Sequence, residues 1–339
     1  MNLKLLLKRG ALIAAANWQT IAIQFAAETT FQVLLTVPIV GAAVLAAALA
    51  GGDLAELLRG SLREMFTTIA GTLMSEPVAL IAFMTAFSIV LFGGSVLMFL
   101  VKGGTVEVLL AAESSSGPIE LEPLTYETAI RPSSRFTLQR FTDGCRRLFR
   151  RYLMLGIGLM IVYGASGGAY LAFATYGYRA AAGVRLAMIG WTFLAALAAI
   201  VLVTWITLVN WAYMLVQIAM ATEDVGVVAA CGAVARFLRA RFVEVAGIFG
   251  VVLALVAAAT LASALAWSGV GLIAFVPLIG LAVFPMQIAA LVLRGLVFEY
   301  LGLTALAAYA TLYHRHIAQV GRVADRKRMN AGRLVGKPA

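Results

Sequence analysis

Long runs without a charged residue recur along this chain of 339 residues. Leu186 to Thr222 covers 37 residues without a charge, and Leu153 to Tyr178 covers 26. A helix needs about 20 apolar residues to cross the hydrocarbon core of a bilayer, which is roughly 30 Å thick. Charged residues make up only 12% of the chain, about half of their share in soluble domains. The runs therefore predict an integral membrane protein in which lipid solvates most of the apolar side chains.

Six segments are predicted to cross the membrane as helices, which makes the fold all-α, a polytopic helical bundle. Residues 272–284 contain Pro277 and precede Pro285, so they are interpreted as a short interfacial or re-entrant element. Residues 1–316 then form one membrane domain, followed by a basic tail at 317–339 that frays beyond Asp325. The predicted spans are approximately 29–52, 77–101, 153–178, 186–215, 245–268 and 285–313.

Amphipathic segments precede the pairs of spans. The segment from Phe141 to Tyr152 combines an apolar stripe with flanking arginines, a pattern typical of a helix on a membrane surface. Residues 227–242 repeat it, and residues 3–28 give a third surface helix with Trp18 as an anchor at headgroup level. The predicted architecture is three helical hairpins, each introduced by an amphipathic interfacial helix. The stripes contain Phe141, Cys145, Leu148, Phe149 and Tyr152 in the first segment and Val227, Cys231, Val234, Leu238 and Phe242 in the second.

Arginines beside these stripes are the predicted contacts of anionic lipid headgroups, because basic residues next to a span are attracted to anionic leaflets. They are Arg146, Arg147, Arg150, Arg151, Arg236, Arg239 and Arg241.

Lysine and arginine are distributed unevenly between the two predicted sides of the membrane. One side carries 21 of them and the other 4, with Arg294 inside a span. Cytoplasmic loops are enriched in basic residues, so both chain ends are predicted to be cytoplasmic, with residues 53–76 forming a surface helix on the opposite side. This topology explains the net charge of +10. Because no nucleic-acid-binding motif accompanies the charge, nucleic acid is excluded as a partner.

Arg294, Glu299 and Asn210 are the candidate residues of a polar site inside the membrane. A charge at that depth costs roughly 3 kcal/mol or more and usually faces a partner or a cavity. Arg294 and Glu299 are five residues apart and point in different directions around a helix. Two interpretations stay open. In the first, the residues form a substrate or proton site. In the second, the role of Arg294 is structural: it contacts Asn210, Glu28 or a backbone carbonyl and so ties helices together, or it extends to the outer surface of the membrane.

Motifs for other chemistry do not occur in the sequence. Five glutamates from Glu107 to Glu127 are interpreted as part of a solvated loop rather than as catalytic carboxylates, because no partner motif accompanies them. His314 and His316 do not share a helical face, which argues against a metal site. Phosphate-binding, dinucleotide-binding, zinc-hydrolase and nucleophile-triad motifs are missing. The sequence therefore predicts no metal, no cofactor and no catalytic residue, although these absences do not exclude an intramembrane enzyme.

Three stretches carry a resemblance to known proteins: Gly144 to Tyr152, Ala235 to Phe242 and Ala308 to Arg315. Together they resemble a loose group of uncharacterised bacterial inner-membrane proteins. That group includes the membrane domain attached to some glycerophosphodiester phosphodiesterases. The resemblance implies a six-helix membrane domain in the bacterial cytoplasmic membrane. The phosphodiesterase domain itself has no counterpart in this sequence, so no catalytic residue is carried over.

Together, these features favour a multi-pass membrane scaffold or accessory protein that binds anionic headgroups, with protein partners or a second copy of the chain as further expected contacts. The alternative is a transporter or lipid-handling permease with a polar site around Arg294 and Glu299. An enzyme acting on lipid is the third possibility. A water-filled cavity at Arg294 or Glu299 would favour transport, and a dry, fully packed bundle would favour a scaffold.

Overall fold

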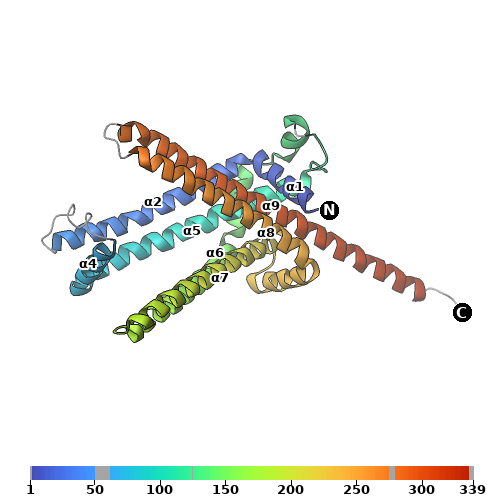
Figure 1. The fold of residues 1–339 in the computed structure, drawn as a ribbon. Coiled ribbons are helices and arrows are strands. Elements are labelled where there is room, and N and C mark those ends of the chain that lie inside the picture. Colours follow the sequence, from blue (N-terminus) through green and yellow to red (C-terminus); the bar gives the residue numbers. More distant parts are fainter. Residues whose placement is uncertain (1, 50–61, 124, 275–278, 336–339) are drawn as a thin grey trace. The chain divides into compact units, whose positions relative to one another are not determined.

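The computed structural model describes residues 2–49, 62–123, 125–274 and 279–335, most of which are helical (Figure 1). These residues contain no β-strand, so the predicted all-α fold is confirmed. Six helices are long and apolar enough to cross a membrane, in agreement with the six predicted spans. The elements are α1 (Leu3–Ala16), α2 (Trp18–Leu49), α4 (Leu62–Ser75), α5 (Pro77–Ser115), η1 (Tyr126–Ile130), η2 (Arg131–Ser133), α6 (Leu138–Ala181), α7 (Arg185–Glu223), α8 (Val227–Ala274) and α9 (Ile279–Val335).

The chain forms two compact units, residues 22–102 and the remainder. In the unit of residues 22–102, small side chains let α2 and α5 approach each other. Ala42 of α2 and Ala79 of α5 are buried together. Farther along, a Cβ added to Gly94 of α5 would lie 2.0 Å from the ring of Phe31 of α2. Small residues at such contacts are typical of helix packing in membranes, where backbones must come close to gain van der Waals contact.

The other unit buries its core at one end, which we call the hub. The hub comprises residues 2–21, 103–123, 125–152, 213–248 and 303–322, and within it α1 contacts α8, α9, η1 and η2. Its fully buried large side chains include Tyr152, Phe237 and Tyr309. The hydroxyl of Tyr309 accepts a hydrogen bond from the indole nitrogen of Trp211 at 3.0 Å, which ties α9 to α7. Within the hub, the helices are therefore surrounded mainly by other parts of the protein rather than by solvent.

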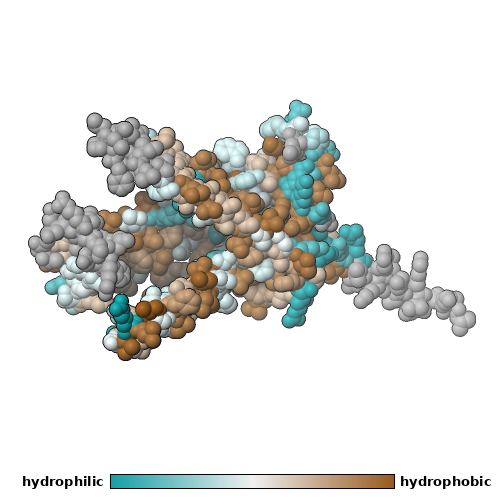
Figure 2. Space-filling view, viewed as in Figure 1, coloured by the Kyte–Doolittle hydropathy of each residue, from teal (hydrophilic) through white to brown (hydrophobic). Residues whose placement is uncertain are grey.

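Beyond the hub, the same helices expose large apolar side chains. Leu186 is 81% exposed and Phe193 is 76% exposed, both on α7. Figure 2 shows hydrophobic side chains along the α6–α7 hairpin, with hydrophilic ones at its turn and more of them where the hub lies. Exposed apolar surface on this scale is unusual in a soluble monomer but expected for helices that lipid solvates. The structure thus supports a multi-pass membrane protein.

Aromatic and polar side chains hold the α6–α7 hairpin together outside the hub. The indole nitrogen of Trp205 donates to the hydroxyl of Ser166 at 3.0 Å. Nearer the turn, the rings of Phe173 and Trp191 lie 4.7 Å apart, and a Cβ at Gly177 would lie 2.1 Å from the Trp191 ring. The two helices can approach this closely only because residue 177 has no side chain.

The apolar stripe of residues 141–152 packs against protein, whereas the sequence placed it against the membrane. Phe141, Leu148 and Tyr152 are buried, and glycines make room for them on both helices. A Cβ at Gly104 of α5 would lie 2.7 Å from the Phe141 ring, and one at Gly144 of α6 would lie 2.4 Å from the Cβ of Glu107. The flanking arginines stay on the outer side of α6 because the apolar face turns inward.

In the second segment, at 227–242, the buried residues coincide only in part with the predicted stripe. Ala230, Val234 and Phe237 are buried, whereas Cys231 and Phe242 are exposed. The helix kinks at Arg241, where φ is −134° and ψ is 29°. The kink separates this segment from the apolar part of α8, whereas α6 runs from its basic segment into its apolar part without a break.

Several element limits differ from the prediction. Of the predicted interfacial or re-entrant element at 272–284, residues 272–274 are helical within α8 and residues 279–284 within α9, while residues 275–278 lie outside the described part. Helix α9 continues through Pro285 and through the predicted frayed tail to Val335. The predicted helix at 3–28 divides at Asn17 into α1 and α2. Of the predicted helix at 53–76, α4 is described, while residues 53–61 are not.

Candidate functional site

A buried arginine, Arg9 of α1, organises the charged side of the hub. Only 5% of Arg9 is exposed. Its Nη1 atom donates to the carboxylate of Glu120 at 2.7 Å and to the carbonyl of Gly117 at 2.7 Å. Its Nη2 atom donates to the carbonyls of Glu113 and Ser116, each at 3.0 Å. These carbonyls lie at the C-terminus of α5, where helix carbonyls lack partners within the helix. Arg9 therefore caps α5 with a positive charge.

Two residues of α9 complete this ionic cluster. The Nδ1 atom of His314 lies 2.5 Å from a carboxylate oxygen of Glu113, and Arg315 lies 3.3 Å from Glu120. Glu113 and Glu120 are 8% and 5% exposed. The interpretation of all five glutamates as a solvated loop is therefore wrong for these two, which are buried because each finds cationic partners on α1 and α9. We call Arg9, Glu113, Glu120, His314 and Arg315 the ionic cluster.

The sequence itself contains a signal for the ionic cluster. Arg9 follows the buried Leu6 by three residues and precedes the buried Ile13 by four, so it lies within the apolar stripe of α1. Glu113 likewise follows the buried Leu109 by four residues on α5. A cation and an anion that each interrupt an apolar stripe are candidates for pairing, because an unpaired buried charge is costly.

Asn17 ties the end of α1 to the segment that leads into α6. Its side chain is fully buried at the end of α1. The amide nitrogen donates to the carbonyls of Ile13 and Ser133, each at 2.9 Å. The amide oxygen accepts from the backbone nitrogens of Arg135 and Phe136 at 2.8 and 3.0 Å. All four bonds that an asparagine amide can form are thus made, and they hold α1 to the segment that leads into α6.

The pKa values of Glu113 and Glu120, which lie outside the predicted spans, are both lowered. Burial raises the pKa of Glu113, but the hydrogen bond from His314 and the charges of His314, Arg9 and Arg315 outweigh it. Burial also raises the pKa of Glu120. Hydrogen bonds from its own backbone and from Arg9, together with the charges of Arg9 and Arg315, lower this pKa by more than burial raises it. Both carboxylates are therefore ionised at neutral pH and hold the two arginines in place.

Acidification is expected to loosen the hub. A carboxyl group whose pKa is lowered by folding stabilises the native state above its unfolded pKa, and the stabilisation is lost as the pH falls through the native pKa. The melting temperature of the detergent-solubilised chain should therefore fall steeply below about pH 4.5. A Glu113→Gln, Glu120→Gln double variant should melt at a lower temperature at pH 7 and show a flatter dependence on acid. Equal pH dependence in both proteins would contradict the assignment.

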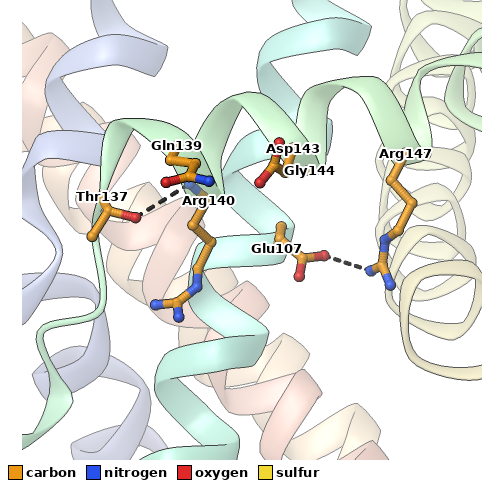
Figure 3. Close-up of a pocket in the computed structure, with 7 residues that line it drawn as sticks. All are labelled: Glu107, Thr137, Gln139, Arg140, Asp143, Gly144 and Arg147. Atoms are coloured by element: carbon orange, nitrogen blue, oxygen red, sulfur yellow. Dashed lines mark hydrogen bonds and ion pairs between the residues drawn. The ribbon is translucent and has the colours of Figure 1, made fainter.

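A polar cavity of 440 Å³ lies where α6 crosses α5. Figure 3 shows Arg147 of α6 reaching Glu107 of α5, and the bond between them measures 2.5 Å. Arg140 and Asp143 of α6 also line the cavity, and the Thr137 side chain caps the start of α6 by accepting from the Arg140 backbone nitrogen at 3.2 Å. The lining carries two positive and two negative side chains, so its charges balance.

The predicted headgroup arginines fall into two sets. Arg147 pairs with Glu107, Arg151 with Asp224 and Arg241 with Glu244. The remaining four are exposed and form no hydrogen bond or ion pair with any residue that the structure describes; they are Arg146, Arg150, Arg236 and Arg239. We call these four the free arginines. Arg146 and Arg150 are four residues apart and Arg236 and Arg239 three apart, so each pair shares one helical face.

The intramembrane candidates do not form one polar site. Asn210 of α7 accepts a hydrogen bond from the Tyr163 hydroxyl of α6. Arg294 is exposed, lies over the Phe298 ring at 5.6 Å, and borders a mostly apolar cavity of 390 Å³ between α8 and α9. Glu299 is buried with 9% exposure, so its side chain takes a different side of α9 from Arg294. Asn210 thus links α7 to α6 through a hydrogen bond, while the side chain of Arg294 is exposed on the surface of α9.

Among the described residues, no group of three or more His, Cys, Asp or Glu side chains is placed so that it could hold a metal ion. No family model, curated protein or solved structure matches the chain. The resemblance to the membrane domain of some glycerophosphodiester phosphodiesterases therefore stays an expectation. What the fold defines is a class: a multi-pass helical membrane protein in which one of two compact units contains a charged, packed hub.

Proposed function

We propose that this protein is a membrane scaffold whose hub lies on the cytoplasmic face of a bacterial inner membrane and binds anionic lipid headgroups. The observation that carries the proposal is the division of the arginines. Those needed to hold the hub together are paired with carboxylates, while the free arginines are exposed at the start of apolar runs. Basic side chains beside a span attract anionic lipids by about 1 kcal/mol each.

A rigid hub suits a scaffold better than a protein that must change conformation as it works, such as a transporter. The ionic cluster joins α1, the end of α5, its following loop and α9, and three of its five side chains, those of Arg9, Glu113 and Glu120, are buried. Breaking such a cluster during a functional cycle would leave buried charges without partners, at several kcal/mol each. A scaffold requires no such change, and its task of holding partners at a membrane is served by a fixed platform.

Lipid binding by the free arginines is testable with the whole chain in detergent. Native mass spectrometry would measure the binding of phosphatidylglycerol and phosphatidylcholine. An Arg146→Gln, Arg150→Gln variant should weaken the affinity for phosphatidylglycerol about thirtyfold, because two favourable interactions of about 1 kcal/mol are lost. Affinity for phosphatidylcholine should stay unchanged.

The matched control removes the same charge elsewhere. Arg179 and Arg185 are also exposed, at the turn between α6 and α7 away from the hub. An Arg179→Gln, Arg185→Gln variant should keep the affinity for phosphatidylglycerol. Equal losses in the two variants would mean that net charge alone governs binding, and the proposed headgroup site would be rejected.

One observation favours a permease as the second candidate function. Arg294 is exposed about 22 Å along α9 from Ile279, beside the cavity between α8 and α9. A charge facing lipid is costly and often marks a substrate path. A flux of anions or lipids in proteoliposomes that Arg294→Leu abolishes would support this function, whereas a scaffold gives no flux above that of protein-free vesicles.

A further inference from the structure

A second cavity of the hub, of 310 Å³, opens between the kink of α8 and the part of α9 beyond the predicted last span. Its polar lining combines three arginines with one histidine, one amide and one carboxylate: Arg241, Arg315, Arg322, His316, Gln319 and Glu244. Two apolar side chains, Leu6 and Leu312, line it as well and are themselves buried. We call this cavity the arginine pocket.

The backbone and the neighbouring side chains hold the guanidinium groups in position. The kink at Arg241 turns its side chain toward α9, where it donates to Gln319, and a second bond of 2.9 Å reaches Glu244. Arg315 is fixed by Glu120 at 3.3 Å. Each guanidinium has five N–H donors, so both arginines keep further donors after these bonds are made. The pocket therefore offers preorganised donors on two helices.

Charge in the arginine pocket is unbalanced, unlike charge in the cavity at the α5–α6 crossing. Three guanidinium groups line it with a single carboxylate, that of Glu244, which pairs with Arg241. Arg315 pairs with Glu120 outside the lining, and Arg322 forms no ion pair with a residue that the structure describes. The imidazole of His316 adds a neutral polar group, because burial and the charge of Arg241 lower its pKa. Like charges gathered in one cavity repel each other, and an anion bound among them would relieve that repulsion.

We propose that the arginine pocket binds a phosphate monoester. Arginine matches phosphate oxygens with paired N–H donors, and several arginines around one cavity suit a doubly charged anion. A volume of 310 Å³ lies at the small end of ligand sites and suits a headgroup or a small metabolite rather than a polymer. The phosphate belongs either to a lipid whose chains stay in the bilayer or to a soluble compound. This site is separate from the free arginines and does not rest on the proposed function.

The test measures both sources with the full chain. Inorganic phosphate and glycerol 3-phosphate are titrated calorimetrically into the detergent-solubilised protein. Phosphatidic acid is offered in nanodiscs and bound lipid is counted by native mass spectrometry. Arg322→Gln is the main variant, because the hydrogen bond that Arg322 forms within the described part of the chain is with the carbonyl of Ala318 on its own helix, so its removal leaves the ionic cluster intact. Loss of a charged hydrogen-bond donor should weaken phosphate binding about tenfold to a hundredfold.

The control variant is Arg179→Gln, Arg185→Gln, which removes two exposed charges at the turn between α6 and α7, outside the pocket. It should leave the affinity unchanged. In NMR titrations, phosphate should raise the pKa of His316 in the parent protein and not in Arg322→Gln. Binding of phosphatidic acid alone, dependent on Arg322, would identify a lipid as the source, and binding of the soluble probes would identify a metabolite. No binding of any probe, or equal affinity in Arg322→Gln and the parent protein, would overturn the proposal.

Discussion

Replacing Arg9 by alanine is expected to lower the free energy of unfolding by about 3–5 kcal/mol, the cost of leaving buried charges without a partner. Arg9 is 5% exposed and contacts Glu113, Glu120 and three carbonyls at the end of α5. Its removal leaves the helix end uncapped and the carboxylates less well compensated. In thermal unfolding of the detergent-solubilised chain, the midpoint should fall by the order of 10 °C.

Companion variants separate charge from geometry. Arg9→Lys keeps the charge but offers a point charge in place of a planar fork, so it should recover only part of the stability. Lys4→Ala removes a positive charge from an exposed position on the same helix and should change little. In the pair Arg9→Met, Glu120→Gln, the loss should be smaller than the sum of the single losses. A midpoint for Arg9→Ala equal to that of Lys4→Ala would disprove burial of the guanidinium.

Alanine at Gly10 is the second substitution with a large expected effect. A Cβ at this position would lie 2.5 Å from the carbonyl oxygen of Thr304 and 3.0 Å from the backbone nitrogen of Ala308. Backbone atoms of a helix cannot move aside as a side chain can, so α1 must shift away from α9. The shift would weaken the bond from the Tyr300 hydroxyl to the Ala11 carbonyl, now 3.2 Å, and pull Arg9 from its partners.

The expected cost of Gly10→Ala is about 3 kcal/mol, at the upper end for overpacking. Gly302→Ala is the matched control, since a Cβ at residue 302 of α9 meets nothing within 4 Å. This control should be neutral or stabilising by up to about 1 kcal/mol, because alanine favours helix. The measurements are the melting temperature and the rate of proteolysis. A Gly10→Ala protein as stable as Gly302→Ala would show that α1 does not pack closely on α9.

Local sequence patterns were enough to predict the helices but not to predict how the helices pack together. Leu186 to Thr222 has no charge, and α7 covers this run. The sequence identified Phe141, Leu148 and Tyr152 as one face of a helix. It did not indicate whether this face packs against lipid or against protein. Lipid and protein are both apolar, so an apolar stripe does not distinguish them. The glycines of the α5–α6 crossing decide in favour of protein, and their effect depends on residues distant in sequence.

The polar candidates show the same limit. Arg294 was recognised as unusual because a charge in an apolar run stands out by itself, and the structure leaves it exposed on α9. Asn210 was grouped with it, although its partner is Tyr163 of the preceding helix. In the sequence, Arg9 was only one of the 21 basic residues on the predicted cytoplasmic side. Its partners lie more than 100 residues away, beyond the reach of any periodicity.

By itself, the sequence determined that this chain is a helical membrane protein with six apolar helices and basic residues concentrated between particular runs. Run length and local charge are properties of neighbouring residues, and the free energy of transfer into lipid depends on them directly. Only the tertiary structure decided which charges are paired and which remain free. Pairing depends on whether α1 can reach α9, and that contact is possible because residue 10 has no side chain to separate the two backbones.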